Sequence, residues 1–130
     1  MLATPDFDGC NAVSGENATI LVVDDDAEVR EVVAEYLMDS GHRVLQAAGG
    51  VEALRVLDRA PDIDLVITDV RMPDISGIDL AERITREIPS PRVILISGYF
   101  VPQQVNRRVL RKPFRMQELE EAIRAELASR

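Results

Sequence analysis

The stretch Asp-Leu-Val-Ile-Thr-Asp-Val-Arg-Met-Pro-Asp, residues 64–74, decides the fold. Leu65 to Thr68 are apolar or β-branched and are bounded by Asp and a Pro-containing loop, which predicts a short strand buried on both faces. Asp69 stands where this strand gives way to the loop. Ligands and chemistry collect at that carboxyl end in an open parallel sheet. Asp69 is therefore either a common strand-ending turn residue or a functional group, and the remaining sequence must distinguish the two.

The length and composition indicate a single domain. The chain has 130 residues, of which 46% are hydrophobic, and no apolar run is long enough to span a bilayer. Residues 1–17 are predicted to be a flexible leader, which leaves residues 18–130 for the domain. One cysteine, Cys10, excludes an internal disulfide and fits a reducing, cytoplasmic compartment. Acids outnumber bases 23 to 15, and the formal charge of -8 disfavours direct binding to nucleic acid.

Strand and helix patterns alternate along the chain. Further strands are predicted at Thr19–Val23, Arg43–Ala47, Arg92–Ile96 and Val109–Arg111. Helices are predicted at Ala27–Ser40, from Gly49 and Gly50 to about Arg59, at about Ile78–Ile88 and at Gln117–Ala128. In the first helix, the stripe predicted to face the sheet is Val29, Val32, Val33, Tyr36 and Leu37. Such alternation predicts right-handed βαβ units and a doubly wound parallel α/β sheet. Five strands on this length favour the flavodoxin-like order 2-1-3-4-5.

This strand order would gather acids at one edge of the sheet. Asp24 and Asp25 follow the first strand, and Asp69 follows the central neighbouring one. Asp24 to Asp26 would serve as an amino-terminal helix cap, but one acid suffices for capping. Because several close carboxylates cannot all stay ionised without compensation, the cluster fits a hard divalent cation, and Mg²⁺ is the expected ion.

The fourth and fifth strands would bring Ser97 and Lys112 to the same edge. A carboxylate beside Mg²⁺ can attack phosphorus and form an aspartyl phosphate, with a lysine and a hydroxyl binding the phosphate oxygens. Singly, Lys112 is equally well a solvated lysine and Ser97 a turn former. Their joint placement with the acids favours the chemical interpretation. His42, the only histidine, is expected to be an ordinary loop residue rather than a phosphoryl donor.

From about Ala18 to Arg130, the chain resembles the receiver domain of two-component response regulators, the CheY-like fold. The motifs that carry the resemblance are Ile-Leu-Val-Val-Asp-Asp-Asp (20–26), residues 64–77, Ile-Leu-Ile-Ser-Gly-Tyr (94–99) and Leu-Arg-Lys-Pro-Phe (110–114). The resemblance implies that Asp69 is the phosphoacceptor, with Ser97 as switch hydroxyl and Lys112 contacting phosphate. It implies Mg²⁺ bound by Asp25, Asp69 and the carbonyl of Arg71, with Asp24 acting through a metal-bound water. It also implies a cis Lys112-Pro113 peptide bond.

Two departures from the family pattern are present. The family's switch aromatic usually stands three residues before the lysine, where this chain has Val109. The segment between Ser97 and Lys112 leaves room for a short or degenerate fourth helix only. Such shortening is found in some stand-alone receivers and in receivers attached to hybrid kinases. Arg71 and Tyr99, each two residues beyond a site residue, are candidates for tuning the lifetime of the phosphate.

The resemblance implies a signalling receiver rather than an enzyme for other substrates. Its phosphodonor would be a phosphohistidine on a sensor histidine kinase or a histidine phosphotransfer protein. Output is expected through protein contact, or the domain drains phosphoryl groups as a phosphate sink. Two alternatives remain: a receiver-like interaction module that is never phosphorylated, and an aspartyl-phosphate phosphohydrolase. A phosphohydrolase of this kind would need an acid two residues after the nucleophile, where this chain has Arg71.

Overall fold

A five-stranded parallel sheet forms the centre of the molecule in a computed structural model, which describes residues 17–98 and 107–128. The strands lie in the order β3-β2-β4-β5-β6, which is 2-1-3-4-5 along the chain, and this confirms the predicted fold. Their bounds are β2 Thr19–Val23, β3 Arg43–Ala47, β4 Leu65–Asp69, β5 Arg92–Ser97 and β6 Arg108–Arg111. Each strand lies within one residue of its predicted bounds.

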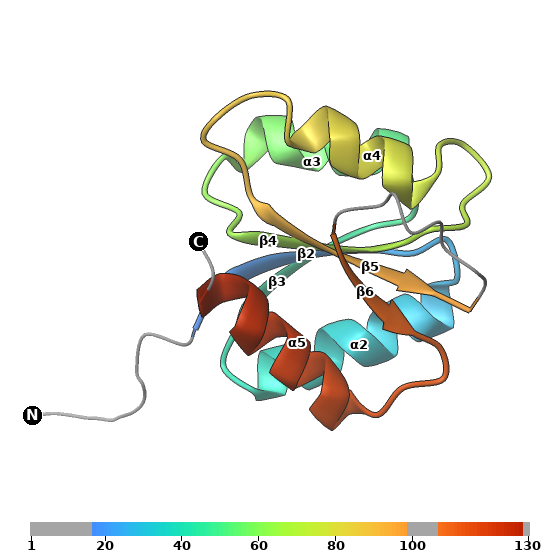
Figure 1. The fold of residues 1–130 in the computed structure, drawn as a ribbon, viewed down its shortest axis with the longest axis vertical. Coiled ribbons are helices and arrows are strands. Elements are labelled where there is room, and N and C mark those ends of the chain that lie inside the picture. Colours follow the sequence, from blue (N-terminus) through green and yellow to red (C-terminus); the bar gives the residue numbers. More distant parts are fainter. Residues whose placement is uncertain (1–16, 99–106, 129–130) are drawn as a thin grey trace, which may run out of the picture.

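Four helices among the described residues cover the two faces of the sheet. They are α2 Ala27–Asp39, α3 Gly50–Arg59, α4 Gly77–Ile84 and α5 Met116–Ala128. Helices α2 and α5 lie on one face and α3 and α4 on the other (Figure 1). This doubly covered arrangement explains why the central strands are apolar on both faces rather than alternating.

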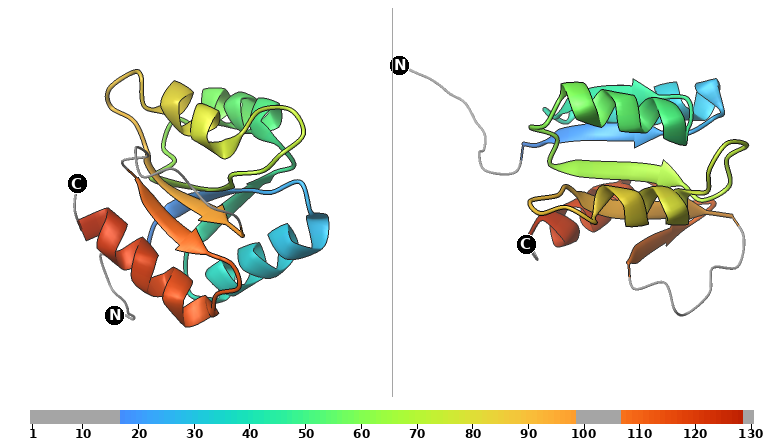
Figure 2. Two further views of the ribbon diagram at one scale, coloured as in Figure 1. Left: turned by 45° about the vertical axis from the view of Figure 1, so that its right-hand side comes forward. Right: turned by 90° about the horizontal axis from the view of Figure 1, so that it is seen from above.

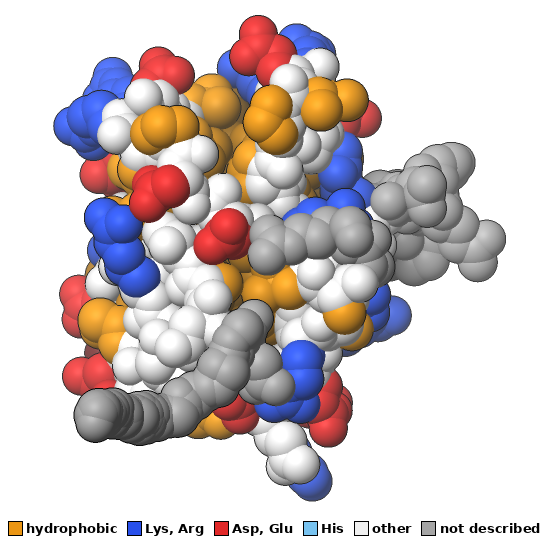
Figure 3. Space-filling view, turned by 90° about the vertical axis from the view of Figure 1, so that its left-hand side faces the viewer, with side chains coloured by type: hydrophobic (Ala, Val, Ile, Leu, Met, Phe, Trp, Pro, Cys, Tyr) orange, Lys and Arg blue, Asp and Glu red, His pale blue; other side chains and the backbone are white. Residues whose placement is uncertain are grey.

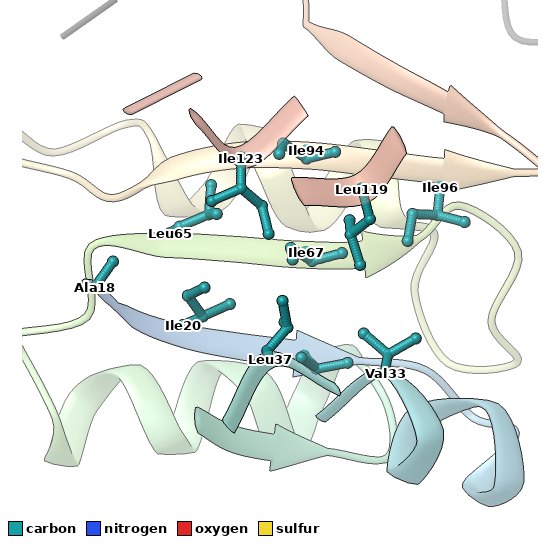
Figure 4. Packing of buried hydrophobic residues seen from close by; sticks show 11 residues of the cluster. Ala18, Ile20, Val33, Leu37, Leu65, Ile67, Ile94, Ile96, Leu119 and Ile123 are labelled. Carbon is teal, nitrogen blue, oxygen red and sulfur yellow. The ribbon is translucent and has the colours of Figure 1, made fainter. Parts of the chain in front are cut away.

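The core divides into two hydrophobic clusters, one on each face of the sheet. The first lies between the sheet and helices α2 and α5, with Leu37, Leu119 and Ile123 packing over Ile20, Ile67 and neighbouring residues (Figure 4). The second joins the opposite side chains of the same strands to helices α3 and α4. Because both clusters use β2 and β4, the ends of these two strands are held from both sides.

The helix α4 is shorter than predicted. The sequence pattern favoured a helix to about Ile88, whereas the helix ends at Ile84. Thr85 caps it, with its backbone amide and its hydroxyl both donating to the carbonyl of Ala81. Beyond it, Pro89 follows Ile88 through a cis peptide bond. A residue before proline avoids the helical region, which keeps Ile88 out of the helix, but the helix already ends at the Thr85 cap.

The predicted inner face of α2 was partly wrong. Val33 and Leu37 are buried as expected, but the side of the helix that carries Ala34 completes the contact with the sheet. Val29 is 36% exposed and Val32 is 57% exposed. Apolar residues occupy a wider arc of this helix than the sheet can cover, so periodicity alone did not define which part faces inward.

All five strands end at the same side of the sheet (Figure 2). The loops after β2 and β4 therefore meet there, as the predicted topology requires. On the opposite side, where the strands begin, acidic and basic side chains are interspersed among hydrophobic ones (Figure 3). No helix in the described ranges is long and apolar enough to cross a membrane. The leader up to residue 16, the expected fourth helix and Tyr99 lie outside the described residues.

Candidate functional site: an acidic cluster at the carboxyl edge

Asp69 is the last residue of β4 and stands at the centre of the sheet's carboxyl edge. The strand before it is buried, and Asp69 lies opposite Ile96 of β5 in the parallel ladder. Gly77, the first residue of α4, packs directly against it. A Cβ atom on Gly77 would lie 2.2 Å from the carbonyl oxygen of Asp69. Only glycine therefore allows this approach, which brings the start of α4 against the backbone of the site.

Three carboxylates meet at this edge, as the sequence predicted. Asp24, Asp25 and Asp69 each offer an oxygen, and these oxygens all lie within 4.8 Å of one another. Asp26 has a different role, because its carboxylate accepts hydrogen bonds from the amides of Glu28 and Val29 and caps α2. The run of three acids thus divides into one helix cap and two members of the cluster.

The charge on Asp24 carries a desolvation cost. Its side chain is buried, with the residue 6% exposed. Burial raises the pKa of Asp24, the nearby charge of Asp69 raises it further, and the amide of Asp26 and the ammonium of Lys112 oppose this. A cation placed among these oxygens would remove the cost. The donor set is all oxygen, without His or Cys among the clustered residues, which fits a hard divalent ion such as Mg²⁺.

Lys112 and Ser97 join the acids at the same end of the sheet, from β5 and from the residue that follows β6. The ammonium nitrogen of Lys112 lies 3.5 Å from Oδ2 of Asp69. The backbone amide of Lys112 donates to the carbonyl of Ser97 over 2.9 Å, which places the two residues together. Ser97 ends β5 and is 1% exposed. The Lys112-Pro113 bond is cis, as expected.

Of the other residues considered in the sequence, Arg71 follows Asp69 and Val109 precedes Lys112, whereas His42 lies at the opposite end of the sheet, just before β3. Arg71 is exposed in the loop that follows Asp69, and its backbone carbonyl is expected to be a metal ligand. Val109 is half-buried and packs against the cluster under α3 and α4. His42 lies in its predicted turn, with its Nδ1 accepting a hydrogen bond from the amide of Ala18 over 3.1 Å.

Two residues beside the site were missed by sequence reasoning. Arg30 donates from Nη1 to the carbonyl of Asp24 over 2.8 Å and from Nε to the side chain of Gln46. Asp74 binds backbone amides of α3. Arg30 looked like an ordinary polar helix residue, and Asp74 looked like a turn residue after proline. Both bridge segments that are distant in sequence, so no local signal identified them.

Comparison with known proteins agrees with this site. Residues 20–124 match the family model of the response regulator receiver domain. The chain is 32% identical over 111 residues to the sensor kinase CckA of Brucella abortus and 36% identical over 119 residues to the DNA-binding transcriptional regulator NtrC of Azospirillum brasilense. These alignments cover 79% and 86% of the chain, but 12% of the kinase and 24% of the regulator.

Solved structures are similar over most of the chain. The receiver domain of the hybrid histidine kinase CckA superposes with a TM-score of 0.74 at 36% identity, covering 84% of this chain and 98% of that one. The response regulator TrrA of Thermotoga maritima, solved in complex with Mg²⁺ and BeF, has a TM-score of 0.74 at 32% identity. Their coverage is 83% of this chain and 97% of TrrA.

The chain belongs to the response regulator receiver domain family. Its function is that of a signalling module in two-component phosphorelays. The fold, the cluster of acids and the family agree, and none of them favours the phosphohydrolase or the unphosphorylated module.

Proposed function

We propose that Asp69 accepts a phosphoryl group from a phosphohistidine and holds it as an aspartyl phosphate. The observation that carries this proposal is the position of Asp69, between two acids within 4.8 Å and a lysine at 3.5 Å. A lone strand-ending acid would need neither. The donor is a sensor histidine kinase or a histidine phosphotransfer protein, in keeping with the kinases and regulators among the relatives.

Phosphoryl transfer needs one nucleophile, and it needs positive charge to balance the negative charge of the phosphate oxygens. A carboxylate oxygen of Asp69 forms a bond to phosphorus while the phosphorus–nitrogen bond of the donor breaks, and its electron pair returns to the imidazole ring. Lys112 neutralises charge on the phosphate oxygens, and the hydroxyl of Ser97 hydrogen-bonds one of them. Hydrolysis later returns inorganic phosphate and the free carboxylate.

Mg²⁺ is the proposed cofactor. Asp25, Asp69 and the backbone carbonyl of Arg71 would hold it, and Asp24 would act through a bound water. When bound, it supplies the positive charge that the crowded carboxylates and the incoming phosphate both require. The buried Asp24, whose pKa is raised by desolvation, supports this assignment because the ion would relieve that penalty.

Output is proposed to proceed through protein contact, or the domain drains phosphoryl groups as a sink. Val109 occupies the position of the usual switch aromatic and is half-buried against the core. Valine has no aromatic ring that could change its rotamer on phosphorylation. The conformational change must therefore use other residues. The proposed compartment is the cytoplasm, a reducing environment that suits a chain with one cysteine.

A phosphorylation assay tests the proposal directly. The protein is incubated with Mg²⁺ and acetyl phosphate and its intact mass is followed. We expect a gain of one phosphoryl group in the wild type and none in Asp69→Asn. The matched control is Asp62→Asn, which removes an exposed acid paired with Arg43 and should phosphorylate normally.

Two other outcomes would overturn the proposal. Absence of any mass gain in the wild type, with Mg²⁺ and donor in excess, would indicate an unphosphorylated interaction module. Rapid turnover of diverse phosphoesters would indicate a hydrolase.

Arg71→Ala should change the rate at which the phosphorylated protein loses its phosphoryl group, because this side chain follows the acceptor in the exposed loop.

A further inference from the structure

Asp74 connects the loop after Asp69 to a helix from another part of the chain. Its Oδ2 accepts a hydrogen bond from the amide of Val51 over 2.9 Å, and its Oδ1 accepts from Gly50 over 3.2 Å. Oδ1 also accepts from the amide of Ile75 over 2.8 Å. One exposed carboxylate thus binds three backbone amides, two of which belong to the first turn of α3.

The helix α3 depends on this contact because it has no cap of its own. Gly49 stands at the capping position and offers no side chain, so the first amides of the helix lack a local acceptor. Gly50 brings the loop closer still: a Cβ atom there would lie 2.2 Å from Cγ1 of Ile75. The loop therefore packs tightly on the helix start through both a carboxylate and an apolar side chain.

The neighbouring end of β3 holds the other half of the site. The amide of Asp24 donates to the carbonyl of Ala47 over 3.2 Å. Arg30 binds the carbonyl of Asp24 through one guanidinium nitrogen and the side chain of Gln46 through another. Residues 46–51, which we term the β3–α3 corner, thus contact both loops that carry the acidic cluster.

We propose that Asp74 is a positioning residue for the metal site, an inference that rests on the proposed function. The loop 70–76 closes on itself through a hydrogen bond from the amide of Gly77 to the carbonyl of Val70. Asp74 ties this loop to the β3–α3 corner and thereby fixes where the carbonyl of Arg71 stands relative to Asp24. Losing the tie leaves every proposed ligand in place but reduces their preorganisation.

The competing explanation is that Asp74 merely stabilises α3, and a second substitution separates the two. Asp74→Ala removes the tie. Gly49→Ser, added in that background, restores a local cap to α3 without restoring the tie. Room exists for this side chain, because the atoms nearest to a Cβ atom on Gly49 would be the carboxylate oxygens of Asp74, at 3.0 and 3.2 Å, and Asp74→Ala removes them. Asp79→Ala, an exposed acid in the first turn of α4, is the control for the lost charge.

Calorimetric titration with Mg²⁺ and amide hydrogen exchange are measured on all four proteins. We expect Asp74→Ala to weaken Mg²⁺ binding by about threefold or more. The loss should stay below about tenfold, the smallest effect typical of residues that hydrogen-bond a metal ligand directly. The amides of Gly50 and Val51 should exchange faster. The double variant should regain slow exchange at these amides while Mg²⁺ binding stays weak, and Asp79→Ala should bind as the wild type does.

Three results would contradict the inference in distinguishable ways. Unchanged Mg²⁺ binding in Asp74→Ala would remove the positioning role and leave the proposed function intact. Recovery of binding in the double variant would show that Asp74 acts through helix stability alone. If the wild type bound no Mg²⁺, the proposed function itself would fail. Should Asp74→Ala not fold, Asp74→Asn keeps one acceptor oxygen and must still weaken binding.

Discussion

The ammonium nitrogen of Lys112 lies 3.5 Å from Oδ2 of Asp69, although β4 and β6 are separated by β5 in the sheet. This distance is at the outer limit of a hydrogen bond, and the lysine side chain is 34% exposed. Such a pair contributes little to folding, at most about 1 kcal/mol. Lys112 is also the only lysine in the chain, since the other basic residues are arginines. The pair is therefore better explained by the chemistry of the site than by stability.

Replacing Lys112 should separate function from folding. Lys112→Met is expected to change the free energy of unfolding by less than about 1 kcal/mol, because a partly exposed pair is lost. It should slow phosphorylation by roughly a hundredfold, the effect typical of losing a preorganised charged donor. Urea denaturation and the rate of mass gain with acetyl phosphate measure the two effects. A large loss of stability with normal phosphorylation would assign Lys112 to the fold instead.

A methyl group at Gly77 should displace the acceptor. The added Cβ of Gly77→Ala would overlap the backbone of Asp69, so we expect a loss of about 2 kcal/mol or more in the free energy of unfolding. Gly98→Ala is the matched control, since its nearest neighbour would be the Cβ of Lys112 at 3.7 Å, an ordinary contact. Denaturation midpoints that fall equally in both variants would show that the close approach at Gly77 is not the cause.

The contribution of Asp74 to stability should depend on pH. Hydrogen bonds from the amides of Val51 and Ile75 lower the pKa of Asp74 below its ordinary value of 3.8. Its contribution is therefore present above that value and is lost as pH falls through the lower pKa of the folded state. The difference in unfolding free energy between wild type and Asp74→Ala should shrink below pH 3.8. A difference that grows on acidification would contradict the assignment.

The buried acid of α5 should matter for folding rather than for signalling. Glu126 accepts hydrogen bonds from Arg92 of β5 at 2.8 Å and from Arg108 of β6 at 3.0 Å. Glu126→Gln removes the charge from these bonds, and we expect a cost of about 1–2 kcal/mol. The exposed pair of Arg43 and Asp62 is the comparison, where Asp62→Asn should cost almost nothing. Thermal unfolding measures both, and Mg²⁺ affinity should be unchanged.

Much of this protein follows from its local sequence pattern. Buried strands are short apolar runs, and each is bounded by turn residues that need no tertiary information to recognise. The alternation of strands and helices permits few sheet orders, so the meeting of Asp24, Asp25 and Asp69 at one edge was predictable. The end of α4 was predicted too far along because Pro89 was taken as the stop signal, whereas the helix already ends at the Thr85 cap. In α2, Val32 was placed on the wrong side because its apolar arc is wider than the buried contact.

Residue identity and strand order by themselves therefore determined which acids, hydroxyl and lysine gather at the carboxyl edge. Tertiary structure alone decided that Arg30 and Asp74 connect the two acid-bearing loops to the β3–α3 corner. The physical reason is range: strand patterns arise from neighbouring residues, whereas a hydrogen bond between loops depends on how distant segments pack. No periodic pattern in the sequence therefore predicts which loops are joined by such hydrogen bonds.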